Sequence, residues 1–175
     1  MIYAHMDSPV GALLLAGEGD VIECIRFSSG PRALGADAGW QRQDGAFQAA
    51  RQQLEEYFAG ARRQFDLPLA PRATAFQARV LAALQTIPYG ETRSYRDIAE
   101  ALGNPKAVRA VGGANARNPI PIVIPCHRVI GRGGALTGFG GGLDAKRVLL
   151  ALEARQSGGP HSGGVPPLSS GSGVT

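Results

Sequence analysis

Helix start and stop signals recur between residues 74 and 115, and they constrain the fold of this chain more than any other feature. Thr74 to Gln77 match a capping box, in which each side chain bonds a backbone N–H group of the other residue. An apolar stripe at helical spacing follows, and Pro88 ends it because proline cannot continue a helix. The stripe consists of Phe76, Val80, Ala83, Leu84 and Ile87. The sequence therefore predicts an amphipathic helix packed on a core.

Two shorter helices are expected next. Ser94 to Asp97 opens the first, and Gly103 lies past its end. Asn104-Pro105 supplies an N-cap followed by a proline at the first helical position, so the second helix should run from about residue 105 to 115. The first helix should turn Ile98, Ala101 and Leu102 inward. Two helices joined across one Gly-Asn turn predict a helix-turn-helix.

The second of these helices is almost bare, since five of its residues are alanine or glycine. Glycine costs about 1 kcal/mol in a helix relative to alanine, so two in a row need a reason. One reason is a tight crossing over another helix. The other is a smooth surface that lets the helix press into a nucleic-acid groove, held by a few cations. The small residues are Ala107, Ala110, Gly112, Gly113 and Ala114, and the cations are Lys106, Arg109 and Arg117.

Charge divides the chain into two parts. Residues 1–70 hold six basic and nine acidic residues, whereas residues 71–155 hold twelve basic and five acidic residues. A polyanionic partner for the second part alone is one interpretation, and an unevenly charged solvated surface is the other.

The amino-terminal part reads as a small sheet with one helix. Residues 11–16 and 21–27 are short apolar or alternating runs around a Gly/Asp turn, which predicts a β-hairpin. An apolar stripe from Phe47 to Phe58 predicts a helix, with Asp44 before it and Gly60 after it, and residues 64–69 could add a strand. We therefore expect an α+β fold with a support domain over 1–70, a mostly helical domain over 71–155 and a disordered tail over 156–175.

No apolar run approaches the length of a membrane span, and the first residues lack the pattern of a signal peptide, so a soluble cytoplasmic protein is expected. The cysteines Cys24 and Cys126 are then two free thiols. His5 and Cys24 lack further ligands for a zinc site, so no metal is predicted. The glycine-rich stretch 131–142 matches neither a phosphate loop nor a dinucleotide fingerprint, and no cofactor is expected.

Cys126 carries the chemistry that we expect. It stands between Pro125 and His127, with Arg128 next, where the apolar, strand-like run 120–125 ends. Neighbouring cations or a helix end lower the pKa of a thiol and supply the nucleophilic thiolate. The alternative is a buried cysteine that only packs.

From about Thr74 to Glu153 the chain resembles the O6-alkylguanine-DNA alkyltransferases, the methylated-DNA–protein-cysteine methyltransferases. The run Ile124-Pro-Cys-His-Arg-Val-Ile130 is similar to the family's active-site motif. Four further motifs follow the family's order and spacing: Ile87–Tyr95, Gly103–Asn115, Asn118-Pro119 and Gly140–Leu143. The amino-terminal segment matches more loosely, and the resemblance implies a ribonuclease H-like domain there.

The resemblance implies a role for each matching residue. Cys126 would be the nucleophile and permanent alkyl acceptor, and His127 would take its proton through a bound water. Glu153 would orient His127, and Asn118 would hold the turn around the cysteine. This is the logic of nucleophile, base and orienting residue in a triad.

Substrate and DNA contacts are implied in the same way. Tyr95 would donate its phenolic proton to the guanine, the carbonyl groups of Cys126 and Val129 would accept from its exocyclic amine, and the N–H of Gly140 would face O6. Arg109 would fill the space left by the flipped nucleotide. The rest of the DNA-binding surface would be Lys106, Ala110, Gly113 and Ala114.

The expected function is single-turnover DNA repair, in which a monomer moves an alkyl group from O6 of guanine, or less readily O4 of thymine, in double-stranded DNA to Cys126. One rival is a helix-turn-helix regulator whose cysteine only senses alkylation. The other is a multiple-turnover cysteine hydrolase, which would have no use for a basic half.

Overall fold

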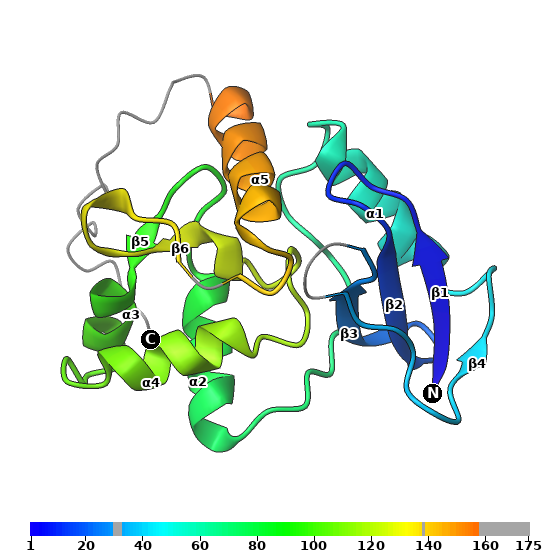
Figure 1. Cartoon of the computed structure of the whole chain (residues 1–175), viewed down its shortest axis with the longest axis horizontal. Coiled ribbons are helices and arrows are strands. Elements are labelled where there is room, and N and C mark those ends of the chain that lie inside the picture. The colour runs from blue at the N-terminus through cyan, green and yellow to red at the C-terminus, as the bar shows by residue number, and fades with distance from the viewer. Residues whose placement is uncertain (30–32, 138, 158–175) are drawn as a thin grey trace.

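The computed structural model describes residues 1–29, 33–137 and 139–157. A small sheet with one helix forms the amino-terminal half, and helices form most of the carboxy-terminal half (Figure 1). The predicted α+β class is therefore confirmed.

The amino-terminal sheet has the strand order β3-β2-β1-β4. Its strands are β1 (Ile2–Met6), β2 (Leu13–Glu18), β3 (Val21–Phe27) and β4 (Gln41–Arg42). The predicted hairpin is confirmed: β2 and β3 pair antiparallel around a turn where Gly19 has a φ of 57°. Sequence reasoning missed β1, which pairs antiparallel with β2, and the short β4, which pairs parallel with β1.

Helix α1 (Gln48–Phe58) packs Ala50, Leu54 and Tyr57 into the core. Phe47, rather than Asp44, occupies its N-cap position, with a φ of 58°. The strand expected over 64–69 does not form. That segment makes a single bridge, Leu69 to Ile22 of β3, so Pro68 and its polar residues leave it a connection rather than a strand.

Local signals predicted two helices of the second half well. Helix α2 (Ala75–Gln85) opens with the predicted Thr74 capping box, and α3 (Tyr95–Ala101) opens with a capping box between Ser94 and Asp97. The inward face of α3 was partly wrong. Ile98 and Ala99 are buried, whereas Ala101, near the helix end, is exposed.

Helix α4 (Val108–Ala116) begins three residues later than expected. The prediction that Asn104 caps it was wrong, because residues 104–107 form a turn. The N–H of Ala107 donates to the carbonyl of Asn104 at 3.0 Å, which uses the backbone groups in a turn before the helix starts. Helices α3 and α4 still contact each other and α2, as a helix-turn-helix requires.

The apolar run before Cys126 is a buried turn and not the strand-like stretch expected. Pro121 bridges to Ile124, and Ile122 has a φ of 75°, which a β-branched residue rarely adopts. The chain then forms a 3-10 turn, η1 (Cys126–Arg128), and β6 (Val129–Ile130), which pairs parallel with β5 (Arg93–Ser94). A second 3-10 turn, η2 (Arg132–Gly134), follows.

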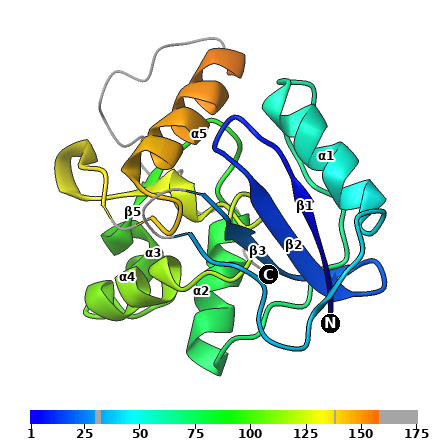
Figure 2. The ribbon, with the colours of Figure 1, turned by 45° about the vertical axis from the view of Figure 1, so that its right-hand side comes forward.

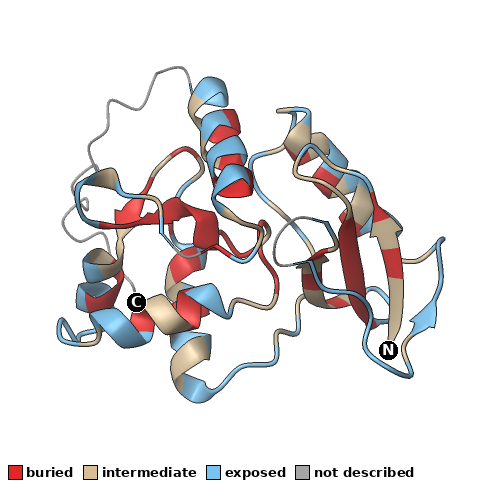
Figure 3. Cartoon of the chain, in the orientation of Figure 1, coloured by how far each residue is buried: buried red, intermediate tan, exposed pale blue. Residues whose placement is uncertain are grey.

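Helix α5 (Leu143–Gln156) closes the described chain. Ala145, Leu149 and Leu152 are buried, whereas Val148 is 38% exposed. The buried face of α5 is visible in Figure 3. Two charged residues of this helix, Lys146 and Glu153, are also buried. Of the predicted tail, Gln156 belongs to this helix and Ser157 bonds the carbonyl of Glu153 at 2.7 Å. Residues 158–175 lie outside the described residues.

The two halves share one cluster of buried apolar residues. At the edge strand β3 the N–H of Ile25 donates to the carbonyl of Pro119 at 2.9 Å. Helix α1 faces α5 in both views (Figure 2), and Tyr57 of α1 bonds Glu153 of α5 at 2.5 Å. Residues from both halves therefore meet around η1.

Candidate active site and nucleic-acid interface

Cys126 lies at the start of η1 and is 4% exposed. It lines a cavity of about 330 Å³ between β3 and the segment 115–121. This volume is in the range of small-molecule pockets. The thiol is therefore buried, but at the wall of a cavity. The other walls are Cys24, Ile25, Arg26, Phe27, Leu34, Asn115, Ala116, Arg117, Asn118, Pro119, Pro121 and Gly140.

The electrostatic setting of the thiol differs from the prediction. Burial raises the pKa of Cys126 to about 11, and the Asn118 side chain and the Lys146 charge offset this only in part. The expectation of a thiol pKa lowered by neighbouring cations was wrong for the free protein, because burial outweighs the Lys146 charge and Arg128 turns toward Glu153. The thiol is protonated at neutral pH, so reaction requires a base.

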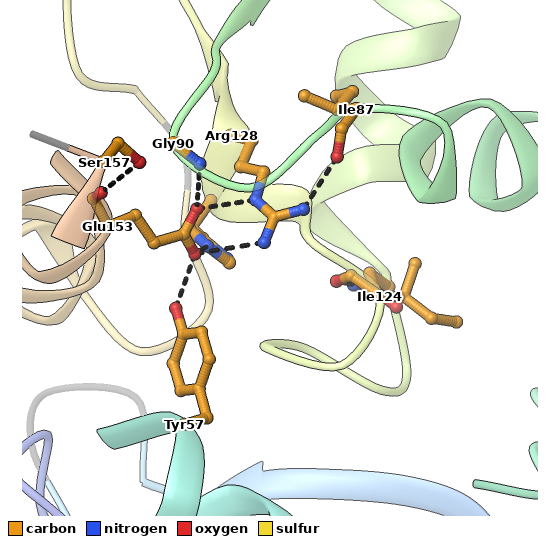
Figure 4. Close-up of polar contacts among 9 residues, drawn as sticks. Tyr57, Ile87, Gly90, Ile124, Arg128, Glu153 and Ser157 are labelled. Carbon is orange, nitrogen blue, oxygen red and sulfur yellow. Dashed lines mark hydrogen bonds and ion pairs between the residues drawn. The ribbon is translucent and has the colours of Figure 1, made fainter. Parts of the chain in front are cut away.

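Glu153 lies at the centre of a buried polar network (Figure 4). Its Oε2 lies 2.5 Å from His127 Nε2, and its Oε1 accepts from Arg128 Nε at 2.7 Å and from the Gly90 N–H at 3.3 Å. Tyr57 donates its hydroxyl to Oε2 at 2.5 Å. A buried carboxylate needs such donors to offset its desolvation.

These contacts determine the charges of Glu153 and His127. Burial opposes a charged Glu153, but the charges and hydrogen bonds of His127 and Arg128 outweigh it and hold the pKa of Glu153 well below its ordinary value. Burial also lowers the pKa of His127, so its imidazole is neutral at pH 7. His127 then donates from Nε2 to Glu153, and Nδ1 is left as the basic nitrogen. Nδ1 is buried and has no hydrogen-bond partner among the described residues, as a base awaiting a proton requires.

Asn118 holds the turn that precedes the cysteine. Its Nδ2 donates to the carbonyl of Ile124 at 2.8 Å, and its Oδ1 accepts from the N–H of Ile120 at 3.0 Å. These bonds bracket Ile122 and its left-handed backbone. The Asn118 side chain thus bonds the turn that precedes Cys126, and its part in the reaction stays a prediction.

The three predicted substrate-binding residues do not all line the cavity. Gly140 does, whereas Tyr95 and Val129 are absent from its described walls. The Tyr95 hydroxyl lies 2.9 Å from Thr137 Oγ1. The carbonyl of Val129 accepts from Lys146 Nζ at 2.6 Å, and Lys146 also donates to the carbonyl of Thr137 at 2.9 Å. The loop before α5 thus connects Tyr95 to the cysteine segment.

The bare helix α4 presents a smooth surface with free cations. Lys106, Arg109 and Ala110 are exposed and Gly113 is half-buried. Neither cation has an ion pair in the described part of the chain. Ala114, the remaining residue predicted to contact DNA, is 2% exposed and packs in the core, where it contributes to helix packing.

The glycines of α4 are not explained by a tight helix crossing. A Cβ atom on Gly112 would meet the Tyr95 ring at 3.9 Å, an ordinary contact. One on Gly113 would meet only the end of the flexible Arg117 side chain, at 3.1 Å. The absence of side chains therefore favours a partner outside the protein over internal packing.

Metal and membrane sites were also considered. The described residues contain no group of three or more His, Cys, Asp or Glu that could hold a metal ion, and the absence of a metal stays a prediction. None of the helices over 1–29, 33–137 and 139–157 is long and apolar enough to cross a bilayer.

Sequence reasoning missed the contacts that Lys146, Arg128 and Tyr57 make in this site. Lys146, Leu149 and Glu153 are spaced i, i+3 and i+7, a pattern that places both charges on the apolar face of α5 and could have revealed Lys146. Arg128 was expected to face the thiol. Tyr57 belongs to the predicted apolar stripe of α1, but no local signal shows where its hydroxyl points.

Comparisons with known proteins agree with this geometry. The family model described as the 6-O-methylguanine DNA methyltransferase ribonuclease-like domain matches residues 1–71, and that described as its DNA binding domain matches residues 75–155. A Methanosarcina acetivorans methylated-DNA–protein-cysteine methyltransferase is 51% identical over 153 residues, which cover 87% of this chain and 98% of that protein. The Mycolicibacterium paratuberculosis protein of the same name is 54% identical over 155 residues, covering 89% and 93%.

Solved structures give the same result. The crystal structure of Mycobacterium tuberculosis OGT in complex with DNA superposes on this chain with a TM-score of 0.84 at 51% identity. The match covers 89% of this chain and 94% of the OGT chain. With both halves matched in order, the chain belongs to the 6-O-methylguanine DNA methyltransferase family.

Proposed function

We propose that this methylated-DNA–protein-cysteine methyltransferase repairs O6-alkylguanine in DNA by moving the alkyl group to Sγ of Cys126, once per protein molecule. One observation carries the assignment to this cysteine. Cys126 is a protonated thiol at the wall of a cavity, and the next residue is a neutral histidine whose Nε2 is fixed on Glu153 and whose Nδ1 is free.

The chemistry is an in-line displacement. The thiol proton passes to His127 Nδ1, directly or through a water, and Sγ forms a bond to the alkyl carbon as the bond from that carbon to O6 breaks. The electron pair of the broken bond stays on the guanine, which takes up a proton and remains in the DNA as the normal base. The thioether is not readily cleaved, so the protein is consumed by one reaction.

Tyr95, Val129 and Gly140 form the proposed base-recognition set. The Tyr95 hydroxyl would leave Thr137 and donate to the departing guanine, where negative charge develops. The carbonyls of Cys126 and Val129 would accept from the exocyclic amine. Val129 can do so while bonded to Lys146, because a carbonyl oxygen has two lone pairs.

DNA binding is assigned to α4. Its small residues let the helix backbone approach the minor groove, and Lys106, in the turn before the helix, neutralises phosphate charge. Arg109 would enter the stack as the damaged nucleotide flips into the cavity. Such contacts read little sequence, which suits a protein that must find damage in any context. A smaller activity on O4-alkylthymine, a monomeric state and a cytoplasmic location are part of the same proposal, as are domain boundaries near residues 70 and 155.

The two rivals are less well supported. A sequence-specific regulator needs base-reading side chains on its recognition helix. The exposed residues of α4 are Val108, Arg109, Ala110 and Ala116, which offer one charged side chain. A hydrolase would need to release its covalent product with water and to act repeatedly.

Reaction stoichiometry separates the three functions. The protein is incubated with a duplex that contains O6-methylguanine, and repaired guanine is counted against protein. Repair that stops at about one equivalent supports the proposal, continued turnover supports the hydrolase, and tight binding without repair supports the regulator. Cys126→Ala should still bind the duplex and repair none of it. If this variant neither binds nor repairs, the cysteine is structural.

A further inference from the structure

The amino-terminal half contributes one described hydrogen bond to the Glu153 carboxylate, from Tyr57. Among the described donors to the Glu153 carboxylate, His127, Arg128 and Gly90 come from the carboxy-terminal half, and Tyr57 comes from α1. Its hydroxyl and His127 Nε2 meet the same oxygen, Oε2, each at 2.5 Å.

The Tyr57 ring is held so that the hydroxyl has little freedom. The residue is fully buried, and its ring packs against Phe58, Phe65 and Tyr89 with centroid distances of 5.3, 5.4 and 6.1 Å. Aromatic packing of this kind restricts the ring to one rotamer. Burial and the nearby Glu153 charge raise the pKa of Tyr57, so its hydroxyl keeps its proton and donates.

We infer that Tyr57 is a positioning residue for the transfer reaction, which fixes Glu153 Oε2 and through it the ring of His127. The bonds that Oε2 forms with Tyr57, His127 and Arg128 leave the carboxylate one orientation. A carboxylate fixed in this way fixes the imidazole plane and the direction of Nδ1. This inference rests on the proposed function, because it assigns His127 the role of base. It gives the sheet-and-helix half a part in the chemistry beyond support.

The chain contains a matched control. Tyr89 belongs to the same aromatic cluster, and its hydroxyl is buried without a hydrogen-bond partner in the described part of the molecule. Tyr57→Phe and Tyr89→Phe each remove one buried hydroxyl and keep the ring. Only the first variant breaks a bond to Glu153.

Two measurements test the inference. In single-turnover assays, Tyr57→Phe should slow methyl transfer about tenfold at unchanged DNA affinity, the size of effect seen when a supporting hydrogen bond to a reacting group is lost. Tyr89→Phe should stay within about twofold of the parent. In a Glu153→Gln background, Tyr57→Phe should cause no further loss, because the tyrosine acts through that carboxylate. Equal rates for both tyrosine variants, or an undiminished loss in the Glu153→Gln background, would overturn the inference.

The second measurement does not depend on activity. The ring-nitrogen NMR signals of His127 report its tautomer and hydrogen bonds, and the chain has only three histidines. These signals should move in Tyr57→Phe and stay in place in Tyr89→Phe. Unmoved signals in a folded Tyr57→Phe would refute the positioning role even if Glu153→Gln is too slow to assay. If Tyr57→Phe does not fold, fluorotyrosine in the parent, a stronger donor, should shift the same signals, and no shift would refute the inference. A parent that repairs no DNA would instead refute the proposed function.

Discussion

Replacing Arg128 with methionine tests the buried network most severely. The Arg128 and Glu153 side chains are 8% and 2% exposed. Arg128 donates to Glu153 Oε1 at 2.7 Å and Oε2 at 3.3 Å, and to the carbonyl of Ile87 at 2.7 Å. Methionine fills much of the same space but supplies no donor and no charge.

The expected loss follows from the charge left behind. Removing one partner of a buried ion pair costs about 3–5 kcal/mol, because the other charge stays desolvated. For a chain of this length each kcal/mol lowers the melting temperature by roughly 2–4 °C, so Arg128→Met should melt roughly 6–20 °C lower. Arg93→Met is the control. Arg93 is equally buried, but its partner Glu91 is 42% exposed, and a loss of about 1 kcal/mol is expected.

The pH dependence of stability gives a second signature. In the parent, burial lowers the pKa of His127. The free energy of unfolding of the parent should therefore decrease as the pH falls below about 6.5 and stay level above pH 7. In Arg128→Met the Glu153–His127 pair carries an uncompensated negative charge and binds a proton more tightly than the unfolded chain does. Stability of the variant should therefore fall as the pH rises from 6 to 8. Urea unfolding at pH 6, 7 and 8 measures both effects. A loss no larger than that of Arg93→Met, or a pH trend like the parent's, would refute this account of the network.

Three further predictions concern the reaction and its scaffold. Because the thiol of Cys126 is protonated and His127 is neutral at pH 7 and above, the single-turnover rate should be level between pH 7 and 8 and fall below pH 6.5 as the lowered pKa of His127 is crossed; a tenfold rise between pH 7 and 8 would mean that hydroxide, not His127, removes the proton. Arg109→Ala should slow repair within a duplex more than attack on free O6-methylguanine, and equal losses in the two assays would exclude a stacking role. Asn118→Ala removes the bonds to Ile120 and Ile124 and should lower stability by about 1–3 kcal/mol in a thermal melt; an unchanged melting temperature would show that the turn holds without it.

Sequence signals that act over a few residues predicted the fold well. The capping boxes at Thr74 and Ser94 were found where expected, because each is closed by contacts within four residues. The prediction that Asn104 caps α4 failed because the carbonyl of Asn104 accepts from the Ala107 N–H in a turn. The same short sequence is compatible with a cap and with a turn, so local signals could not distinguish them. The run Ile120–Ile124 is buried as its composition indicates, but the bonds of Asn118 to Ile120 and Ile124 shape it as a turn. Just before the run, the carbonyl of Pro119 accepts from Ile25 of the distant strand β3.

The family resemblance named the residues that we propose for catalysis. Cys126, His127, Asn118 and Glu153 lie near one another, as the family resemblance implied. The direction of the thiol pKa was not predictable, because burial of Cys126 outweighs the cations that follow it in sequence. Nor was the Tyr57 contact, since it joins residues 96 positions apart.

The most direct test of the central claim is the site of the transferred methyl group. After reaction with a duplex that contains O6-methylguanine, intact mass and peptide mapping should show one methyl group per protein molecule, carried on Cys126. Cys24, a half-buried thiol that lines the same cavity, serves as the internal control and should remain unmodified. A methyl group on Cys24, or repaired DNA with no adduct on Cys126, would contradict the account.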